Sequence, residues 1–372
     1  MQISMSAPDI TSAEIDAVNQ VLQTPYFSIG PKIEEFEHQI AEYIGVKHAI
    51  GVNSGTSGLH LAVIAAGVGQ GDEVITTPFS FVASANCILY ERATPVFVDI
   101  DLQTLNIDPT LIEAAITPRT KAILPVHAFG QPVDMDPILE IADRYNLAVI
   151  EDACEAIGSE YKKRKAGVLS DAAVFAFYPN KQITTGEGGM IVTNNDEWND
   201  IFRSLRNQGR DTFNAWLDHN RLGYNYRLDE MSAALGLAQL HRIDELLAKR
   251  TQVAEWYNAY LCKLDYVRLP YISPDTTYMS WFVYVIRLAK EINRNQVMVD
   301  LQRRNIPSRP YFSCIHLQSF YRNTYGFKPG DFKVTESSAN SVLALPFHGQ
   351  MSQADVAYVC GGLTEVIESQ LS

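Results

Sequence analysis

The sequence predicts an α/β protein with two domains. Through the first half of the chain, apolar runs of strand length alternate with stretches of helical spacing, which is typical of βαβ units and of a mainly parallel sheet flanked by helices. Beyond residue 280 this alternation gives way to an α+β pattern. A chain of 372 residues is long enough for two hydrophobic cores. We expect a larger domain at 1–245 and a smaller α+β domain at 246–372, divided inside a long helical stretch.

The helices are indicated by caps and by apolar spacing. Thr11 and Glu14 form a capping box that begins the first helix, which should end near Gln23. A second helix should end at Gly45, since glycine commonly follows the last helical turn. Further helices are expected at 108–116, 136–146, 197–208, 293–305 and 352–369, with one long or two joined helices at 229–264.

The strands are short apolar runs bounded by turn residues. The expected strands are 73–77, 94–101, 120–130, 147–152, 172–177 and 281–288, and one more precedes Asn53. The basic run at 161–167 is expected to be an exposed hairpin turn rather than a ligand-binding patch. The segment 308–321 is rich in aromatic residues and is expected to be irregular.

A turn of small residues, Asn53–Gly58, joins a strand to the start of a helix. The free N–H groups of a helix N-terminus, together with the hydroxyls of Ser54, Thr56 and Ser57, have the chemistry of a phosphate site. The turn lacks the lysine of a P-loop and the spacing of a dinucleotide-binding motif. A simple helix N-cap with small residues for close packing would have the same sequence, so both the phosphate site and the plain cap stay open.

Reactive polar groups follow two of the predicted buried strands. Asp152 ends the strand at 147–152, and Lys181 comes four residues after the strand at 172–177. Ligands of α/β sheets bind at the carboxyl ends of strands, so the two side chains are expected to face one pocket. A lysine that forms a Schiff base and a carboxylate that keeps a pyridine nitrogen protonated are what pyridoxal phosphate (PLP) chemistry requires. Taken alone, the pair is also compatible with a surface lysine and a turn aspartate.

Phe81 lies between a strand and the following helix, where its ring is placed to stack on a planar cofactor or to pack in the core. The glycines of the GEGG run at 186–189 permit a tight backbone turn beside a bound group.

The composition is that of an ordinary soluble globular protein, with 47% hydrophobic and 20% charged residues. A net charge of −13 argues against a nucleic-acid partner. There is neither a signal-peptide pattern nor an apolar run of membrane-spanning length, so we expect no membrane partner. The five cysteines are scattered without CxxC spacing, which indicates reduced thiols in the cytoplasm and no metal site.

Five segments in series give the chain a family resemblance. They are NSGTSGLHLA at 53–62, DEVITTP at 72–78, EDACEA at 151–156, FYPNKQITTGEGG at 177–189 and GYNYRLDEMSAALG at 223–236. In this order and spacing the chain resembles the sugar aminotransferases of the DegT/DnrJ/EryC1/StrS family, from about Phe27 to the C-terminus. The resemblance implies a fold-type I PLP enzyme with a seven-stranded, mainly parallel sheet in its large domain and a smaller C-terminal domain.

The resemblance also implies roles for single residues. Lys181 would be the Schiff-base lysine and proton shuttle, and Asp152 would pair with the pyridinium nitrogen. Phe81 would stack on the cofactor ring, and Glu155 would lie beside that ring at a position where relatives often have Gln or His. The cofactor phosphate would be bound by Gly55, Thr56 and Ser57, and by Asn225 from the other subunit of a homodimer with a shared active site.

One position departs from the family pattern. Some members have a serine five residues before the lysine that contacts the phosphate, and this chain has Ala176 there. The phosphate contacts would then come from the 54–57 turn, from the partner subunit or from water.

The reaction that the resemblance implies is the transfer of an amino group from L-glutamate to a nucleotide-linked keto sugar, in amino-sugar biosynthesis for polysaccharides or glycosylated metabolites. Candidate substrate contacts are Tyr178, Arg309, Tyr311 and His316. A surface ion pair for Arg309 and a packed, hydrogen-bonded ring for His316 are the plain alternatives.

Four other functions compete with this one. Sugar 3-dehydratases of the same family have a histidine in place of the lysine, so Lys181 argues against them. A keto-cyclitol aminotransferase or the synthesis of an aromatic amino acid precursor would use the same catalytic residues. A non-catalytic binding or regulatory protein would not need an intact Lys181 and Asp152.

Overall fold

A seven-stranded sheet forms the centre of the computed structural model, which describes residues 3–210 and 218–371. The strand order is β1-β9-β8-β5-β4-β2-β3, and β9 alone runs antiparallel to its neighbours β1 and β8. The strands are β1 His48–Val52, β2 Glu73–Thr76, β3 Thr94–Phe97, β4 Thr120–Ile123, β5 Ala148–Asp152, β8 Ala172–Ala176 and β9 Gly189–Thr193. The expected fold class, with a mainly parallel sheet of seven strands, is confirmed.

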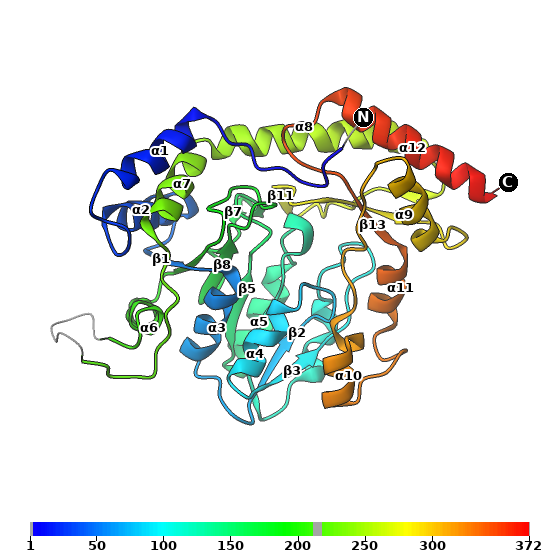
Figure 1. The fold of residues 1–372 in the computed structure, drawn as a ribbon. Helices are drawn as coiled ribbons and strands as arrows, with labels where there is room; N and C mark the ends of the chain where they lie inside the picture. The colour runs from blue at the N-terminus through cyan, green and yellow to red at the C-terminus, as the bar shows by residue number, and fades with distance from the viewer. Residues whose placement is uncertain (1–2, 211–217, 372) are drawn as a thin grey trace.

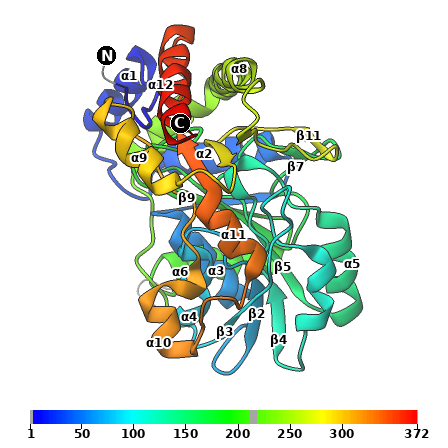
Figure 2. The ribbon, with the colours of Figure 1, turned by 90° about the vertical axis from the view of Figure 1, so that its right-hand side faces the viewer.

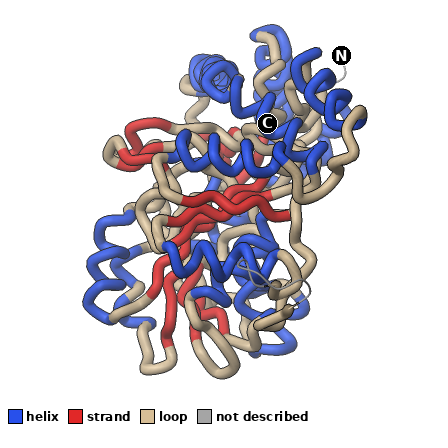
Figure 3. The backbone as a smooth tube through the Cα atoms, turned by 90° about the vertical axis from the view of Figure 1, so that its left-hand side faces the viewer, coloured by secondary structure: helices blue, strands red, loops and turns tan. Residues whose placement is uncertain are grey.

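Helices cover both faces of this sheet, as Figures 2 and 3 show. The flanking helices are α2 Pro31–Ile44, α3 Gly55–Ala65, α4 Ala83–Tyr90, α5 Met135–Tyr145, α6 Asp196–Arg206 and α7 Glu230–His241. Strand β8 explains the two layers: Ala172 and Val174 pack into the core beneath α3, whereas Ala173 and Phe175 pack into the core shared with α2 and α7. Side chains that alternate along a strand bury both faces of the sheet.

The C-terminal part has its own core around a small antiparallel sheet, β10-β12-β13. Its elements are α8 Ile243–Leu261, β10 Val267–Arg268, β12 Tyr284–Leu288, α9 Arg294–Arg303, β13 Val342–Leu345 and α12 Gln353–Leu371. Figure 1 shows α8 passing from the large sheet to the side of α12. Ile3, from the start of the described chain, packs into this core as well. The division at residue 245 stays a prediction.

Several smaller elements complete the chain: α1 Ser12–Leu22, β6 Glu160–Tyr161, β7 Arg164–Lys165, β11 Thr276–Tyr278, α10 Ser319–Tyr325 and α11 Lys333–Ser341. Strands β6 and β7 form the hairpin expected at 161–167. The helix expected at 108–116 is wrong. Two 3₁₀ turns, Pro109–Leu111 and Glu113–Ala115, lie there, and the side chain of Asp108 closes the first turn on the N–H of Thr110.

The long helical stretch consists of two helices, α7 and α8, which meet at Arg242. Within the described residues, no helix combines the length and the apolar character needed to cross a membrane. All five cysteines carry free thiols.

Candidate active site

A cavity of about 470 Å³ opens at the carboxyl ends of the parallel strands. The segments that follow β1, β2, β5 and β8 form its walls with Ser54–Thr56, Ser80–Phe81, Asp152–Glu155 and Ala176–Gly188. Phe282, Tyr311 and Phe312 close it from the C-terminal part of the chain. Lining residues that the sequence places more than a hundred positions apart therefore meet in one space.

The carboxylate of Asp152 is fixed at the end of β5. Its Oδ2 accepts a hydrogen bond from Ser84 Oγ at 3.0 Å, and its Oδ1 accepts one from the N–H of Cys154 at 3.2 Å. The residue is only 6% exposed, yet it lines the cavity. A buried carboxylate with two donors keeps one orientation, so Asp152 presents a directed negative charge to a bound molecule.

Lys181 lies in the loop between β8 and β9, and its side chain is largely buried. Its Nζ lies 3.5 Å from Glu155 Oε1 and 3.9 Å from the centre of the Phe282 ring. The other oxygen of Glu155, Oε2, accepts a hydrogen bond from the N–H of Phe129 at 2.8 Å. Burial raises the pKa of Glu155, although the nearby amine of Lys181 opposes that shift. An amine and a carboxyl group are thus paired inside the cavity.

The turn before α3 presents an anion site to the same cavity. Ser54 caps the helix by accepting a hydrogen bond from the N–H of Ser57 at 3.1 Å. Within the described ranges, the N–H groups of Gly55 and Thr56 have no protein acceptor, and both residues line the cavity. Two free N–H groups at the positive end of a helix dipole attract a phosphate.

Ser57 does not take the place expected for it. Its hydroxyl donates to Asn53 Oδ1 at 2.7 Å and lies 2.9 Å from Ser54 Oγ, and the residue is not part of the cavity wall. The second serine of the turn therefore holds the turn itself together.

Phe81 lies at the mouth of this cavity and is 63% exposed, so the alternative of a core phenylalanine is wrong. Gly55, Thr56, Glu155, Tyr178 and Tyr311 also line the cavity, as Lys181 and Asp152 do. Burial raises the pKa of Tyr311, with a further contribution from the charge of Glu155.

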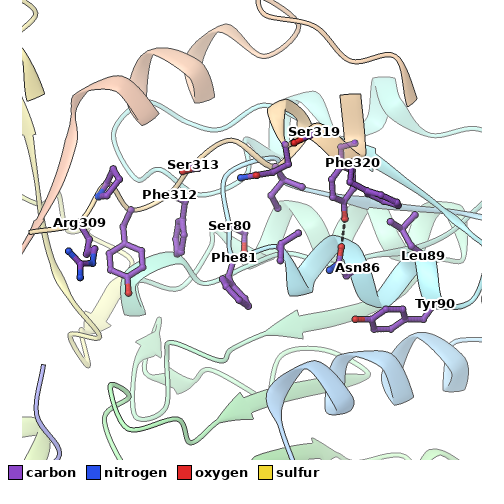
Figure 4. A pocket seen from close by; sticks show the side chains of 16 residues that line it. Ser80, Phe81, Asn86, Leu89, Tyr90, Arg309, Phe312, Ser313, Ser319 and Phe320 are labelled. Carbon is purple, nitrogen blue, oxygen red and sulfur yellow. Dashed lines mark hydrogen bonds between the residues drawn. The ribbon is translucent and has the colours of Figure 1, made fainter. Parts of the chain in front are cut away.

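A second, larger cavity of about 910 Å³ adjoins the first and shares Ser80, Phe81, Tyr311 and Phe312 with it. Figure 4 shows it as a groove between α4 and the segment 309–321, with Arg309 at one end and Tyr90 and Phe320 at the other. Arg309 is the only charged residue in its lining, and the described residues provide no carboxylate partner for the guanidinium. The groove therefore suits an extended ligand with an anionic portion.

Two predicted residues lie away from both cavities of this chain. His316 is fully buried, its Nε2 pairs with Glu336 Oε1 at 3.1 Å, and its ring packs on Phe332, so the packed alternative describes its placement. Asn225 is exposed, and its backbone pairs with Asn207.

Sequence reasoning missed three residues of the site. Asn180 lines the cavity with a buried Oδ1 that has no hydrogen-bond partner. Phe282 supplies the ring beside Lys181 Nζ, and Cys154 Sγ lines the wall behind Asp152. Asn180 lies directly before Lys181, so its position beside the candidate lysine could have predicted its place in the site. No neighbouring sequence feature predicts the place of Phe282.

The cavity fits the cofactor expected from the sequence. PLP requires an amine for its aldehyde, a carboxylate for its ring nitrogen, an anion site for its phosphate and an apolar surface for its ring. Lys181, Asp152, the Gly55–Thr56 turn and Phe81 offer these four groups in one space. The unpartnered Oδ1 of Asn180 adds a buried acceptor that a bound ligand can satisfy.

Comparison with known proteins gives consistent relatives. Residues 8–364 match the family model described as the DegT/DnrJ/EryC1/StrS aminotransferase family. A GDP-perosamine synthase of Caulobacter vibrioides is 45% identical over 98% of each chain. DesV of S. venezuelae, solved in complex with a ketimine intermediate, is 35% identical with a TM-score of 0.91, covering 96% of this chain and 95% of its own. Helicobacter pylori PseC, an aminotransferase involved in the biosynthesis of pseudoaminic acid, is 30% identical with a TM-score of 0.93, covering 99% and 100%.

Proposed function

This chain belongs to the DegT/DnrJ/EryC1/StrS aminotransferase family and is a PLP-dependent sugar aminotransferase, and we propose that it transfers the amino group of L-glutamate to a keto sugar carried on a nucleoside diphosphate. The observation that carries the finer proposal is the groove of about 910 Å³ beside the cavity of Lys181. A hexose alone does not need so much space. A nucleotide does, and the relative from Caulobacter vibrioides is named for a GDP-linked product.

The chemistry of the groove supports a nucleoside diphosphate. The protein has a net charge of −13, yet this groove contains no carboxylate and one guanidinium, Arg309. An unpaired guanidinium binds a diphosphate through two parallel hydrogen bonds. The exposed rings of Tyr90 and Phe320, which Figure 4 places at the far end from Arg309, offer faces on which a nucleobase or ribose can pack.

The cofactor, when bound, supplies an electron sink for the negative charge that develops at the α-carbon of the amino donor. Lys181 Nζ removes the proton from that α-carbon as a general base and returns a proton as a general acid. The apolar face of Phe282 and the carboxyl group of Glu155 keep this amine inside the cavity. Asp152 would keep a proton on the cofactor nitrogen, and the N–H groups of Gly55 and Thr56 would hold its phosphate.

The exchange is balanced without another reactant. In the first half-reaction L-glutamate loses its amino group and takes up the oxygen of one water molecule to become a 2-oxo acid. In the second, the keto sugar gains that amino group and releases its carbonyl oxygen as one water molecule. Tyr178 and Tyr311 line the wall where the sugar would lie, and each has a phenol that can bind a sugar hydroxyl.

We further propose a homodimer in which Asn225 completes the phosphate site of the partner subunit. On its own chain Asn225 is exposed and does not line the cavity, which is compatible with a role across an interface. Five free thiols support a cytoplasmic protein.

The test is a pair of half-reactions followed by absorbance. L-glutamate is added to the PLP-loaded protein, and the absorbance band of the PLP form is followed until it stops changing. The protein is then offered, one at a time, GDP-, UDP- and dTDP-linked keto sugars, the free keto sugar and a keto-cyclitol. We expect glutamate to convert the band and one nucleotide-linked sugar to restore it. Recovery with the free sugar or the cyclitol alone would overturn the nucleotide assignment, and no response to glutamate would overturn the donor.

A further inference from the structure

Arg250, in the helix α8, is a buried cation that the reaction described so far does not use. It is 4% exposed. Within residues 3–210 and 218–371 no carboxylate lies within ion-pair distance of its guanidinium. Burial lowers its pKa to about 10. A buried charge without a counter-ion destabilises a protein unless its hydrogen bonds are all directed at good acceptors.

The guanidinium of Arg250 donates its hydrogen bonds to backbone carbonyl groups of two separate segments. Nη2 donates to the carbonyl oxygen of Lys181 at 2.7 Å. Nη1 donates to the carbonyl oxygens of Trp281 at 3.2 Å and of Phe282 at 3.1 Å. The rigid planar fork of an arginine can hold such an arrangement, whereas the single ammonium group of a lysine cannot match it.

These hydrogen bonds connect the loop that carries Lys181 to the segment 281–282, which supplies the phenylalanine ring beside the lysine amine. Phe282, whose carbonyl Arg250 binds, places its ring 3.9 Å from Lys181 Nζ. A second tie runs in parallel, because Gln182 Nε2 donates to Ser280 Oγ at 2.9 Å and to the carbonyl of Glu155 at 2.6 Å. The lysine backbone and the ring beside its amine are thus fixed to each other from both sides.

We propose that Arg250 is a positioning residue for Lys181, which sets where the amine stands in the cavity by locking the lysine backbone to the 281–282 segment. The residue does not line either cavity, so it acts on turnover without contacting a substrate. Its loss should lower kcat and the rate of cofactor capture while leaving the KM for the amino donor nearly unchanged. Because a misplacement of about 1 Å at a reacting group costs about a hundredfold in rate, we expect losses of about 10- to 100-fold.

The experiment compares Arg250→Lys and Arg250→Gln with Arg294→Lys. Arg294 is a matched control: its Nη1 also donates to a backbone carbonyl, that of Val342 at 2.8 Å, and burial also lowers its pKa, but it lies in the small domain in α9. Each apo-protein is mixed with PLP, and the rate of covalent capture is followed by absorbance, with Lys181 identified after borohydride trapping. Steady-state kcat, KM and thermal stability are then measured on the loaded proteins.

Capture and kcat should both fall in the Arg250 variants and stay near the wild-type values in Arg294→Lys, even where all three lose similar thermal stability. Wild-type capture and kcat in a folded Arg250→Lys protein would overturn the proposal, as would equal losses in Arg294→Lys. Should neither Arg250 variant fold, Phe282→Leu removes the ring that the guanidinium positions. Wild-type capture by that variant would then overturn the proposed route.

Discussion

At the scale of single residues, the site depends on how each charged group is held. Asp152 accepts hydrogen bonds from two donors, Ser84 Oγ and the N–H of Cys154, each at a different carboxylate oxygen. An asparagine keeps one acceptor, Oδ1, for the N–H of Cys154, and its Nδ2 can donate to the hydroxyl oxygen of Ser84. The position can therefore lose its charge while keeping its size. This separates the electrostatic role of the carboxylate from its structural role.

We predict that Asp152→Asn lowers the rate of the glutamate half-reaction by about a hundredfold or more while the protein still binds PLP, since only the stabilised charge is removed. Stopped-flow absorbance of the loaded variant measures this rate. Asp136→Asn, a change at an exposed carboxylate of α5, is the control and should react like the wild type. A wild-type rate in Asp152→Asn would show that the ring nitrogen has another partner.

Residues of the site were predictable from sequence where the signal was local. Asp152 ends an apolar strand, and Lys181 and Phe81 each follow a strand by a few residues, so the chain itself points to them. Phe282 and Arg250 approach Lys181 from positions 101 and 69 residues away along the chain, and only the packing of α8 and of the segment before β12 against the Lys181 loop reveals them. His316 was a candidate substrate contact because of its residue type alone, and it is buried against Phe332 and Glu336.

At the scale of elements, the phosphate turn is positioned by a close approach of α3 to the sheet. A Cβ atom at Gly55 would lie 2.8 Å from Ala176 Cβ and 2.8 Å from Cys154 Sγ. Only a residue without a side chain lets the first turn of α3 touch β8 at this distance. The departure from the family pattern, Ala176, is thus itself in contact with the turn.

We predict that Gly55→Ala pushes the start of α3 away from β8, weakens PLP binding by about tenfold and destabilises the fold by about 1–3 kcal/mol, the usual range for overpacking. Equilibrium binding of PLP and thermal melting measure the two effects. The control is Gly361→Ala in α12, where nothing lies within 4 Å and where alanine should stabilise the helix by about 0.5–1 kcal/mol. Unchanged PLP affinity in Gly55→Ala would contradict this account of the turn.

Elements with strong local signals were predicted well, and elements set by packing were not. The capping box of Thr11 and Glu14 starts α1 as expected. At 108–116, where one helix was expected, the chain forms two separate 3₁₀ turns, and Asp108 caps only the first of them. No element was assigned to 333–345, where α11 and β13 lie: α11 is capped at its start by Asp99, a residue more than two hundred positions away.

At the scale of the whole molecule, an ion-pair network fastens the N-terminal segment to the junction of α7 and α8. Arg242 lies between the two helices and pairs with Asp9 at 3.0 Å and with Glu14 at 2.7 Å. Burial alone would raise the pKa of Glu14, but hydrogen bonds from Thr11, Arg242 and Gln239 outweigh it and lower that pKa to about 2. The carboxylate form is thus the one that stabilises the fold.

Because the folded pKa of Glu14 lies below its ordinary value of 4.5, its contribution is fully present above about pH 4.5 and is lost as the pH falls toward 2. We predict that Glu14→Gln melts at a lower temperature than the wild type at pH 6 and that the difference shrinks as the pH is lowered through this window. Thermal melting at a series of pH values measures it. Glu34→Gln, at an exposed position of α2, should match the wild type throughout, and a Glu14→Gln deficit that stays constant down to pH 2 would contradict the assignment.

The proposed homodimer with a shared active site makes a further prediction. Lys181→Ala should abolish turnover by at least about a thousandfold, and Asn225→Ala should weaken cofactor retention in the homodimer. Mixed dimers of the two variants contain one site with both wild-type residues, so refolding them together should restore about a quarter of the wild-type rate if chains pair at random. Activity no greater than the sum of the separate variants would place Asn225 outside the partner's site.

The residues that form the walls of the cavity are synthesised at different times during translation. Lys181, Asp152 and the turn at Gly55 are complete once the chain has grown past Gly189, but Phe282, Tyr311 and Phe312 follow much later. At about 5–20 residues per second, about 6–25 s pass between Gly189 and Phe312 leaving the ribosome. A nascent chain therefore contains Lys181 and Asp152 before Arg250 and Phe282, which position the lysine, have been synthesised. Chains stalled before residue 250 should fail to retain the cofactor, which makes stable loading with PLP a sign that translation has nearly finished.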